Sequence, residues 1–598
     1  MRDLLRRATA PVSAAGASGT ASGPAAAEAS GTAVAVRAVR GVVCATVVGV
    51  LLTVAGCSSA DRPPEHGTVV DLVRQDWAHV PGVDARDGVL HVTATGRRIV
   101  EQDGSGGVPD PPVDLAGTHL VAPGDVTVAA SFRDVTADAT LAVLDAPPVI
   151  ADEFRIESAG VTLTLRGHDL RIAVSDGAED QDVRDLEPVH EEHVRVDDPE
   201  AELAVHRSGD RLEVTSDGAT VASLPSGDVL DPGTLWLGLS SERGSFTVDS
   251  LHASAPVGTR LATAGPVVEH AERDPEGLQA LAARSRPDFL VGAAVALGPL
   301  AADEDLARDL VRNFGALTPE NAMKPQALSP RQGEYTFQEA DALLDVAERK
   351  GMAVHGHTIA FSEAMPRWMR DLPTGSEQER SASADALLGY VSTVVTHFRG
   401  RLASLDVVNE PFDVDQGTEL QENVWYRVFG ASYPVVVSRA VHDADPDVRQ
   451  FVNENGADVP GPRQDALLRL VLDTNAHGGH IDGVGLQTHV YDLDTDTVTA
   501  DDLAQTLDTF ADAGLLVRIS ETDVDDSEGQ DAQAEQYATI LDTCFHSDAC
   551  VSWTTWGVDD RYDRWLDDAG DLHQGHDLLF SDGEPTPAYD AVRRVLGG

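Results

Sequence analysis

Hydrophobic and polar positions follow several distinct patterns along the 598 residues of the chain. Residues 68–255 contain short runs in which apolar and polar residues alternate, such as Val161-Thr162-Leu163-Thr164-Leu165. Turns such as Ser216-Asp217-Gly218 separate these runs. Alternation is typical of half-buried strands, and short strands between Gly/Asp turns predict an antiparallel sandwich. We therefore expect an all-β jelly-roll or sandwich domain in this range, with closing strands that look concanavalin-like.

From about residue 285, apolar runs of strand length alternate with helical stretches, which predicts βα units and a parallel sheet. The candidate strands are Phe289–Val295, Phe314–Leu317, Ala353–Gly356, Ser404–Val408, Gln450–Asn453, Gly483–Gln487, Leu515–Ser520 and Val551–Trp556. The expected helices include Ala302–Asn313, Phe337–Lys350, Ala382–Arg399, Arg463–His477, Ala500–Ala513 and Gln533–Cys544. These units predict a (β/α)₈ TIM barrel over residues 285–598, with its active site at the C-terminal ends of the strands.

The N-terminal segment has the pattern of an export signal. An uncharged, largely apolar run, Gly41–Gly56, follows a stretch that contains five arginines. The run is short for a membrane span, which needs about 20 residues, so it favours a secretory signal. It ends in Val54-Ala55-Gly56-Cys57, which resembles a bacterial lipobox, although a buried cysteine after a hydrophobic strand is an alternative. We expect residues 1–57 to be a lipoprotein signal and Cys57 to be lipidated on the outer face of the bacterial cytoplasmic membrane.

Two further segments connect these parts. Residues 58–67 are polar and contain Pro63-Pro64, which predicts a tether, and residues 256–284 predict a linker. The β-rich module is poor in aromatic residues, with Trp77, Trp236 and a few Phe. Because sugar-binding surfaces usually need exposed rings, carbohydrate binding and a spacer or packing role both remain open for this module.

Charge and cysteine content narrow the possible partners. The 44 basic and 99 acidic residues give a net charge of −55, which repels nucleic acid and anionic lipid headgroups but not a neutral polysaccharide. Contact with a membrane would therefore require acyl chains. The four cysteines do not form a metal-finger pattern, and in an exported protein Cys544 and Cys550 predict a short disulfide. We expect no metal, no cofactor and a monomer.

Polar residues follow the predicted strands where those strands end, and two of them are acids suited to glycosidic cleavage. That reaction needs a carboxylic acid to protonate the leaving oxygen and a carboxylate on the other face of the sugar. Glu410 follows the fourth strand and Glu521 the seventh, so both face the mouth of the barrel. Asn409 can donate to a sugar 2-hydroxyl, and His489 can hydrogen-bond Glu521 and keep it ionised. Trp556 and Trp565 offer flat faces to pyranose rings.

The ordered motifs resemble glycoside hydrolase family 10, the family of β-1,4-xylanases, over residues 285–598. They are TPENAMKPQALSPRQGEYTFQEADALLDVAERKGMAVHGHT, DVVNEPF, GVGLQTHV and ISETDVD, and the Cys544/Cys550 pair also matches the family. The resemblance implies that Glu410 is the acid/base and Glu521 the nucleophile of a retaining enzyme. It also implies two groups of substrate-binding residues. Those on the non-reducing side of the cleaved bond are Glu320, Asn321, Lys324 and His357. Those around the reacting sugar are Asn409, Gln487, His489, Trp556 and Trp565.

The chain departs from the family after His357-Thr358. The family pattern continues with Trp-His-Ser-Gln, whereas this chain has Phe361-Ser362-Glu363-Ala364. A sugar-facing Trp is thereby replaced by Phe361, and the expected Gln by Ala364. We expect the chemistry to be retained and the outer glycone subsite to be altered.

These observations favour a surface-anchored endo-1,4-beta-xylanase that acts on xylan or its oligosaccharides with net retention. A related β-glycosidase acting on another β-linked glycan or a short glycoside is the alternative within enzymes. A non-catalytic glycan-binding lipoprotein is the alternative of another class, and the presence of both carboxylates disfavours it.

Overall fold

The computed structural model describes residues 69–74, 77, 82–94, 119–122, 125–144, 149–151, 154–156, 159–175, 190–208, 211–225, 233–256, 259, 261–264, 268, 271–413, 417–493, 497–562, 564–566, 572–575 and 577–597. The predicted signal, the tether and Cys57 lie outside these residues. Among the helices that are described, none is both long enough and apolar enough to cross a membrane.

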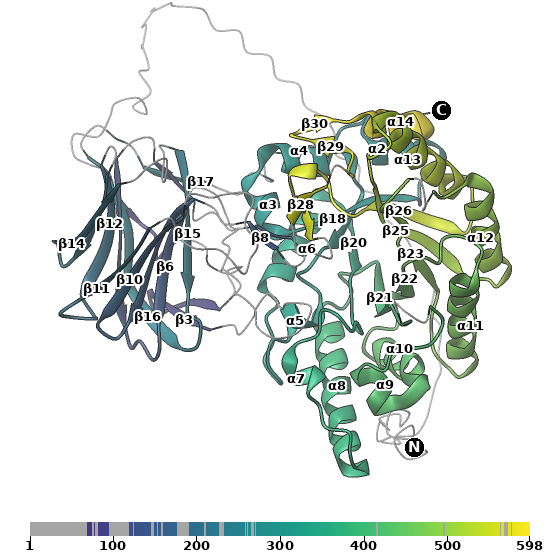
Figure 1. The fold of residues 1–598 in the computed structure, drawn as a ribbon, viewed down its shortest axis with the longest axis horizontal. Helices are drawn as coiled ribbons and strands as arrows, with labels where there is room; N and C mark the ends of the chain where they lie inside the picture. The colour runs from purple at the N-terminus through teal and green to yellow at the C-terminus, as the bar shows by residue number, and fades with distance from the viewer. Residues whose placement is uncertain are drawn as a thin grey trace, which may run out of the picture. The chain divides into compact units, whose positions relative to one another are not determined.

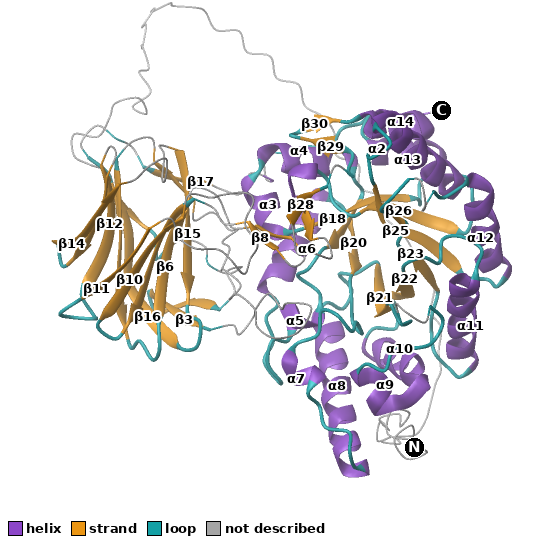
Figure 2. Ribbon diagram, viewed as in Figure 1, coloured by secondary structure: helices purple, strands orange, loops and turns teal. Residues whose placement is uncertain are grey.

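The β-rich region contains two large antiparallel sheets, shown in Figures 1 and 2, and a short antiparallel pair, β7 Val149–Ala151 with β8 Phe154–Ile156. The first has the order β14-β13-β12-β5-β16-β3-β2, with β1 paired to β16, and the second β11-β10-β9-β6-β15-β4-β17. The strands of the first sheet are β1 Val69–Asp71, β2 Val83–Arg86, β3 Val89–Thr93, β5 Val126–Arg133, β12 Glu202–Ser208, β13 Arg211–Ser216, β14 Ala219–Pro225 and β16 Ser245–Ser254. Those of the second are β4 His119–Ala122, β6 Ala139–Leu144, β9 Gly160–Arg166, β10 Asp169–Ser175, β11 His190–Arg195, β15 Gly233–Ser240 and β17 Ala262–Ala264.

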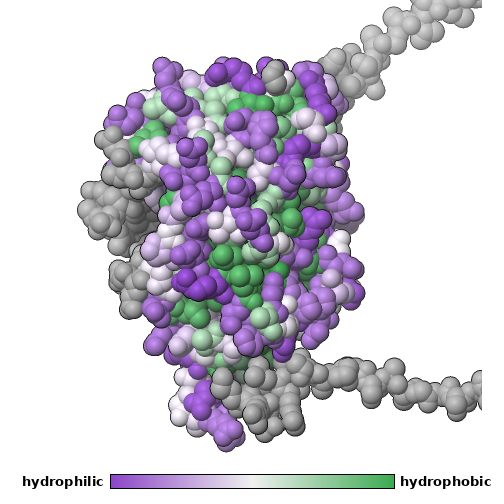
Figure 3. All heavy atoms as spheres, turned by 90° about the vertical axis from the view of Figure 1, so that its right-hand side faces the viewer, coloured by the Kyte–Doolittle hydropathy of each residue, from purple (hydrophilic) through white to green (hydrophobic). Residues whose placement is uncertain are grey.

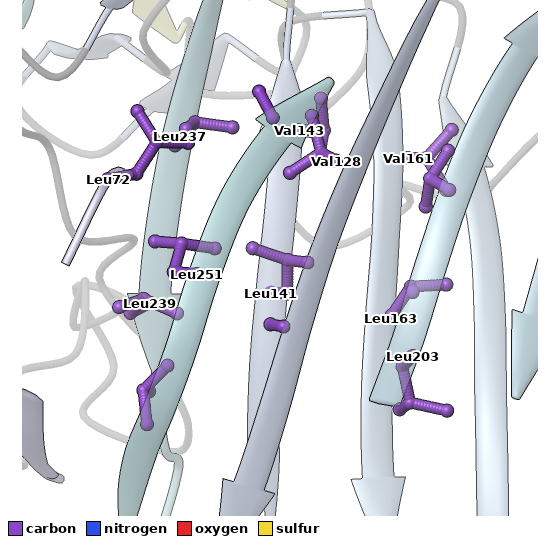
Figure 4. Close-up of a cluster of buried hydrophobic side chains, with 14 of the residues drawn as sticks. Leu72, Val128, Leu141, Val143, Val161, Leu163, Leu203, Leu237, Leu239 and Leu251 are labelled. Carbon is purple, nitrogen blue, oxygen red and sulfur yellow. The ribbon is translucent and has the colours of Figure 1, made fainter. Parts of the chain in front are cut away.

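One hydrophobic core holds the two sheets together. Alternate residues of β6, including Leu141 and Val143, are buried, and they join a cluster with Val128 of the other sheet (Figure 4). This is the arrangement that the alternating pattern predicts for a sandwich. Trp77 and Trp236 are 1% and 7% exposed, so neither ring is available as a surface platform.

Residues 256–284 contain structure that belongs to both domains. Strand β17 pairs with β4 and so extends the second sheet beyond residue 255. Arg273 donates to the backbone carbonyls of Phe314, Lys350 and Gly351 in the barrel region. Helix α2, Leu278–Ser285, directly precedes the first barrel strand.

Eight parallel strands form a closed (β/α)₈ barrel, because β18 pairs with both β19 and β26, and β23 pairs with β25. These strands are β18 Leu290–Val295, β19 Ala316–Pro319, β20 Ala353–Gly356, β21 Ser404–Asn409, β22 Arg449–Glu454, β23 Gly483–Leu486, β25 Leu516–Val524 and β26 Cys550–Thr555. A short additional strand, β24 His489–Val490, pairs with the end of β25. All eight predicted strands are therefore present, with ends displaced by at most a few residues.

The helices surround the strands in Figure 2 and mostly match their predicted ranges. The major ones are α4 Glu304–Asn313, α6 Gln338–Lys350, α8 Glu377–His397, α10 Tyr433–Ala444, α11 Pro462–Ala476, α12 Ala500–Asp512, α13 Gln530–Phe545 and α14 Pro587–Gly597. Helix α8 begins earlier than predicted because Ser376 and Glu379 form a capping box. The predicted helix Ala302–Asn313 is divided, since Asp303 caps α4 and ends the short helix α3, Leu297–Ala302.

The face of the molecule shown in Figure 3 is mostly hydrophilic, with small groups of hydrophobic residues between the polar ones.

Candidate active site

The polar residues predicted at the strand ends lie where the barrel strands finish. Glu320 follows β19, His357 follows β20, and Glu410 follows β21. On the other side of the ring, Gln487 follows β23, and Glu521 lies within the last part of β25. The C-terminal ends of parallel strands meet at one end of the barrel, so these side chains share one site.

Glu521 is buried, with 5% of the residue exposed, and it lies among hydrogen-bond donors. His489 Nε2 is 3.3 Å from Glu521 Oε2, and Asn453 Nδ2 donates to Oε1. Burial alone would raise the pKa of Glu521, but the hydrogen bond from His489 and the nearby His357 and His489 together lower it. Glu521 is thus held as a carboxylate.

His489 lies between two carboxylates. Its Nδ1 is 2.7 Å from Asp523 Oδ2, and its Nε2 faces Glu521. Both contacts are hydrogen bonds only when both ring nitrogens carry hydrogen, that is, in the imidazolium form. Burial opposes that charge, but Asp523 and Glu521 outweigh it and raise the pKa of His489 well above its ordinary value of 6.5. The histidine therefore supplies a positive charge beside Glu521.

Glu410 has the opposite electrostatic setting. Burial raises its pKa, and the charge of Glu521 adds to this effect, although a hydrogen bond from Gln487 opposes it. Gln487 Nε2 and Asn409 Nδ2 approach Glu410 Oε1 at 2.8 Å and 3.2 Å. The two glutamates therefore differ in the way that acid and nucleophile must differ, because one pKa is raised and the other lowered.

The backbone at two site positions is strained. Glu410 and Thr488 have φ angles of 47° and 62°, in the left-handed region that non-glycine residues rarely adopt. Such conformations cost about 1–3 kcal/mol each and occur frequently at active sites. In the pairing of β25 with β26, a register shift between Ile519 and Thr522 also lies at Glu521. Irregularities of this kind change the direction in which a strand's side chains point.

The residues expected on the non-reducing side lie together. Lys324 Nζ is 5.9 Å from the Trp556 ring centroid, and the rings of His357 and Trp556 are 5.3 Å apart. Asn321 Nδ2 donates to Glu320 Oε1 at 3.0 Å. The backbone of Trp565 lies in β27, Arg564–Leu566, but its side chain is outside the described part of the chain.

A buried charged group near Glu521 was not identified from the sequence. Asp406 Oδ2 is 2.8 Å from His355 Nε2 and 3.0 Å from His357 Nδ1. Burial and the nearby Arg518 lower the pKa of His355 to about 4, so His355 is neutral. Burial would raise the pKa of Asp406, but the two histidines hold it below its ordinary value. Asp406 thereby orients His357, whose Nδ1 is 4.0 Å from Glu521 Oε1.

The end of β22 also contributes two residues that sequence reasoning missed. Asn453 donates to Asn409 Oδ1 at 2.8 Å as well as to Glu521, and Asn409 in turn donates to Glu410, so these two amides connect the two catalytic candidates. Glu454 is fully buried and accepts from Arg463 Nη2 at 2.9 Å. Burial raises the pKa of Glu454 to about 7. The signal was present in the sequence, because the polar run Asn453-Glu454-Asn455 begins at the last residue of the predicted strand Gln450–Asn453.

The four residues that depart from the family pattern have different environments. Phe361 and Ala364 are each 7% exposed, and Glu363 is exposed. The ring of Phe361 lies 6.5 Å from that of His357, so this segment is close to a residue that is expected on the non-reducing side. The Ala364 carbonyl accepts from the Gln326 amide at 3.0 Å.

Cys544 and Cys550 form the predicted disulfide, which joins the end of α13 to the start of β26. Among the described residues, there is no group of three or more His, Cys, Asp or Glu side chains that could hold a metal ion.

Comparison with known proteins identifies the family of the barrel region. Residues 280–595 match the sequence profile of Glycosyl hydrolase family 10. Endo-1,4-beta-xylanase B of Thermotoga neapolitana is 31% identical over 292 residues, which is 48% of this chain and 81% of that protein. Endo-1,4-beta-xylanase A of Phanerodontia chrysosporium is 32% identical over 258 residues, covering 42% and 60% of the two chains. The crystal structure of native xylanase 10B from Thermotoga maritima is 29% identical, with a TM-score of 0.49 over 54% of this chain and 98% of that one. The chain belongs to glycosyl hydrolase family 10.

Proposed function

We propose that this protein is an endo-1,4-beta-xylanase that hydrolyses internal β-1,4 linkages of xylan with net retention. The observation that carries the proposal is the pair of acids Glu410, which follows β21, and Glu521, in β25, because their pKa values are shifted in opposite directions. The two xylanases described above, at 31% and 32% identity, support xylan as the substrate.

In the first step, protonated Glu410 donates its proton to the glycosidic oxygen while the Glu521 carboxylate attacks the anomeric carbon. The bond from that carbon to the leaving oxygen breaks, and a covalent glycosyl-enzyme forms. In the second step, Glu410, now ionised, removes a proton from water, which attacks the same carbon and releases Glu521. Asn409 is placed beside Glu410 to donate to the sugar 2-hydroxyl, and Asn453 holds both Asn409 and Glu521.

Replacing each acid separately tests this assignment. Glu521→Gln should abolish turnover of every substrate, because no covalent intermediate can form. Glu410→Ala should slow hydrolysis of xylan by about 10²–10⁴-fold, the usual value of general acid–base help. The same variant should spare the first step on aryl xylosides with good leaving groups, which need little protonation. Glu528→Gln, an exposed glutamate in the loop after β25, is the matched control. Activity of either active-site variant at the wild-type level on xylan would overturn the proposal.

We further propose that the mature protein begins at lipidated Cys57 and is held at the outer face of the cytoplasmic membrane. The apolar run Gly41–Gly56 and the lipobox-like end of that run support this location. Cys57→Ser should release the protein or leave the signal attached. Mass spectrometry that finds an unmodified Cys57 inside an intact N-terminus of the wild-type protein would contradict this proposal.

We also propose that the two-sheet module is a separate concanavalin-like domain and that the barrel folds without it. Because β17 belongs to the module and Arg273 binds the barrel, the division lies between residues 264 and 273. A chain that starts at Ala271 should be soluble and cleave soluble xylan at close to the full-length rate. Insolubility of this chain, under conditions where the full chain is soluble, would mean that the module is required for the barrel to fold.

A further inference from the structure

Tyr491 is an exposed aromatic residue next to the catalytic candidates. Among the described residues, the large hydrophobic side chains that are exposed are Val69, Leu472 and Tyr491, at 67%, 43% and 64%. Only Tyr491 has an aromatic ring and only Tyr491 follows a barrel strand at its C-terminal end. Single exposed hydrophobic residues are common on protein surfaces, so the position of this ring, rather than its exposure alone, calls for an explanation.

The ring is held in place by the histidine that binds the nucleophile. Tyr491 directly follows β24, whose two residues pair with Asp523 and Val524 of β25. Its ring stacks on that of His489, with centroids 5.4 Å apart and planes 15° from parallel. His489 is in turn fixed by Asp523 at 2.7 Å. A ring that is oriented on one side by a fixed partner and exposed elsewhere is a suitable surface for stacking a sugar.

The order of strands in the barrel gives the side of the site on which Tyr491 lies. Around the closed ring the order is β18, β19, β20, β21, β22, β23, β25, β26, so β23 is across the barrel from β19. The glycone candidates Glu320 and Lys324 follow β19, whereas Tyr491 lies in the segment that continues from β23. Tyr491 is therefore on the side opposite the glycone.

The same segment touches the proton donor. Gln487, at the end of β23, donates to Glu410 Oε1 at 2.8 Å. Glu410 protonates the oxygen that leaves with the aglycone, so the first aglycone sugar must lie beside Glu410. A chain that continues from this sugar away from the glycone runs toward the β23–β24 side, where Tyr491 is exposed.

We propose that Tyr491 is a specificity-determining residue on the aglycone side, where its exposed ring stacks on a β-1,4-linked xylose unit of the leaving portion of the chain. This inference rests on the proposed function and deepens it, because it identifies a residue that makes the enzyme prefer long chains over short glycosides. Binding energy from a sugar that does not react can lower the barrier of the reaction itself, so the ring should affect kcat/KM for long substrates.

The test compares two substrates in Tyr491→Ala, Tyr491→Phe and the wild type. Xylohexaose extends into the aglycone side, whereas p-nitrophenyl xylobioside has only its aryl leaving group there. Tyr491→Ala should lower kcat/KM for xylohexaose about tenfold more than for the aryl xylobioside, near the lower limit for a lost apolar contact. Tyr491→Phe keeps the ring and should retain most of the wild-type preference. Leu472→Ala, at an exposed position on α11, is the control and should leave both values unchanged.

Two outcomes would overturn the proposal for Tyr491. An equal loss on both substrates in Tyr491→Ala would show that the ring only supports His489, and an unchanged ratio would show that the ring contacts no substrate. Either result requires an active wild type. A wild-type protein that is inactive on both substrates would instead contradict the proposed xylanase function, so the two failures are distinguishable.

Discussion

Replacing Asp523 by Asn should move the basic limb of the pH–rate profile to lower pH. In the structure, Asp523 Oδ2 is 2.7 Å from His489 Nδ1, and His489 Nε2 is 3.3 Å from Glu521. Asparagine has the same shape and can still accept the hydrogen bond from Nδ1 through its amide oxygen. The substitution therefore removes one negative charge and little else.

The expected size of the effect follows from the strength of that contact. A hydrogen bond between charged groups contributes about 1.5–3 kcal/mol. One pKa unit corresponds to about 1.36 kcal/mol, so the pKa of His489 should fall by about 1–2 units. His489 then loses its proton at a lower pH than in the wild type, and Glu521 loses its cationic neighbour. Once His489 is neutral, its Nε2 no longer donates to Glu521 Oε2, and the nucleophile loses the donor that holds it.

The sign of the pH dependence is determined by the form of His489 that supports Glu521. Only the cationic form donates from Nε2 to Glu521 while Nδ1 donates to residue 523, so a lower pKa of His489 removes activity first at high pH. The profile of kcat/KM against pH reports the free enzyme, and its basic limb should move to lower pH in Asp523→Asn. The acidic limb, which reports the ionisation of Glu521, should move less, because His489 keeps its proton there.

Hydrolysis of an aryl xylobioside between about pH 3 and 9 would measure both limbs, and circular dichroism would establish that the variant is folded at each pH. Asp526→Asn, in the loop just after β25, removes the same charge outside the His489 contacts and is the matched control. A uniform loss of activity at every pH, with both limbs unmoved, would refute the reasoning. It would show that Asp523 orients His489 without controlling its charge.

Three further predictions concern other parts of the barrel. Replacing both Cys544 and Cys550 by Ser should lower the free energy of unfolding by about 2 kcal/mol, because the disulfide closes a loop of only six positions. Urea denaturation would measure this difference. Burial raises the pKa of Glu454 from its ordinary value of 4.5 to about 7, so this residue costs wild-type stability as pH rises through that range. Relative to wild type, Glu454→Gln should therefore gain up to about 3 kcal/mol between about pH 4.5 and 7 in denaturation curves, and a constant difference would contradict this. Ala364→Gln combined with Phe361→Trp should raise kcat/KM for linear xylo-oligosaccharides by up to about tenfold, because one restored hydrogen bond contributes about 0.5–1.5 kcal/mol. An unchanged kcat/KM would mean that other residues form the outer glycone subsite.

Local patterns in the sequence were sufficient to predict both domains. Alternation with period two, seen in Val161–Leu165, predicted strands that bury one face, and the structure places Val161 and Leu163 in the core. Apolar runs between helical stretches predicted all eight barrel strands, because a strand buried on both faces has a continuous hydrophobic run. The strand ends then indicated Glu410 and Glu521, since the barrel topology alone brings those ends together.

The boundary between the two domains could not be predicted in this way. Composition marked residues 256–284 as a linker, but β17 within them completes a sheet through its pairing with β4. That pairing joins positions far apart in the chain, and a three-residue strand has no periodicity of its own to reveal it.

The electrostatic difference between the two glutamates also required the tertiary structure. In the sequence, Glu410 and Glu521 are two acids that each follow or end a strand. The expected contact from His489 and the family resemblance pointed to Glu521 as the ionised one, but neither shows how deeply the two acids are buried or which groups surround them. The difference arises from burial and from neighbours on other strands: Gln487 for Glu410, and Asn453 and His489 for Glu521. The pKa of a carboxyl group depends on desolvation and on charges within a few ångströms, and only folding brings those groups to that distance.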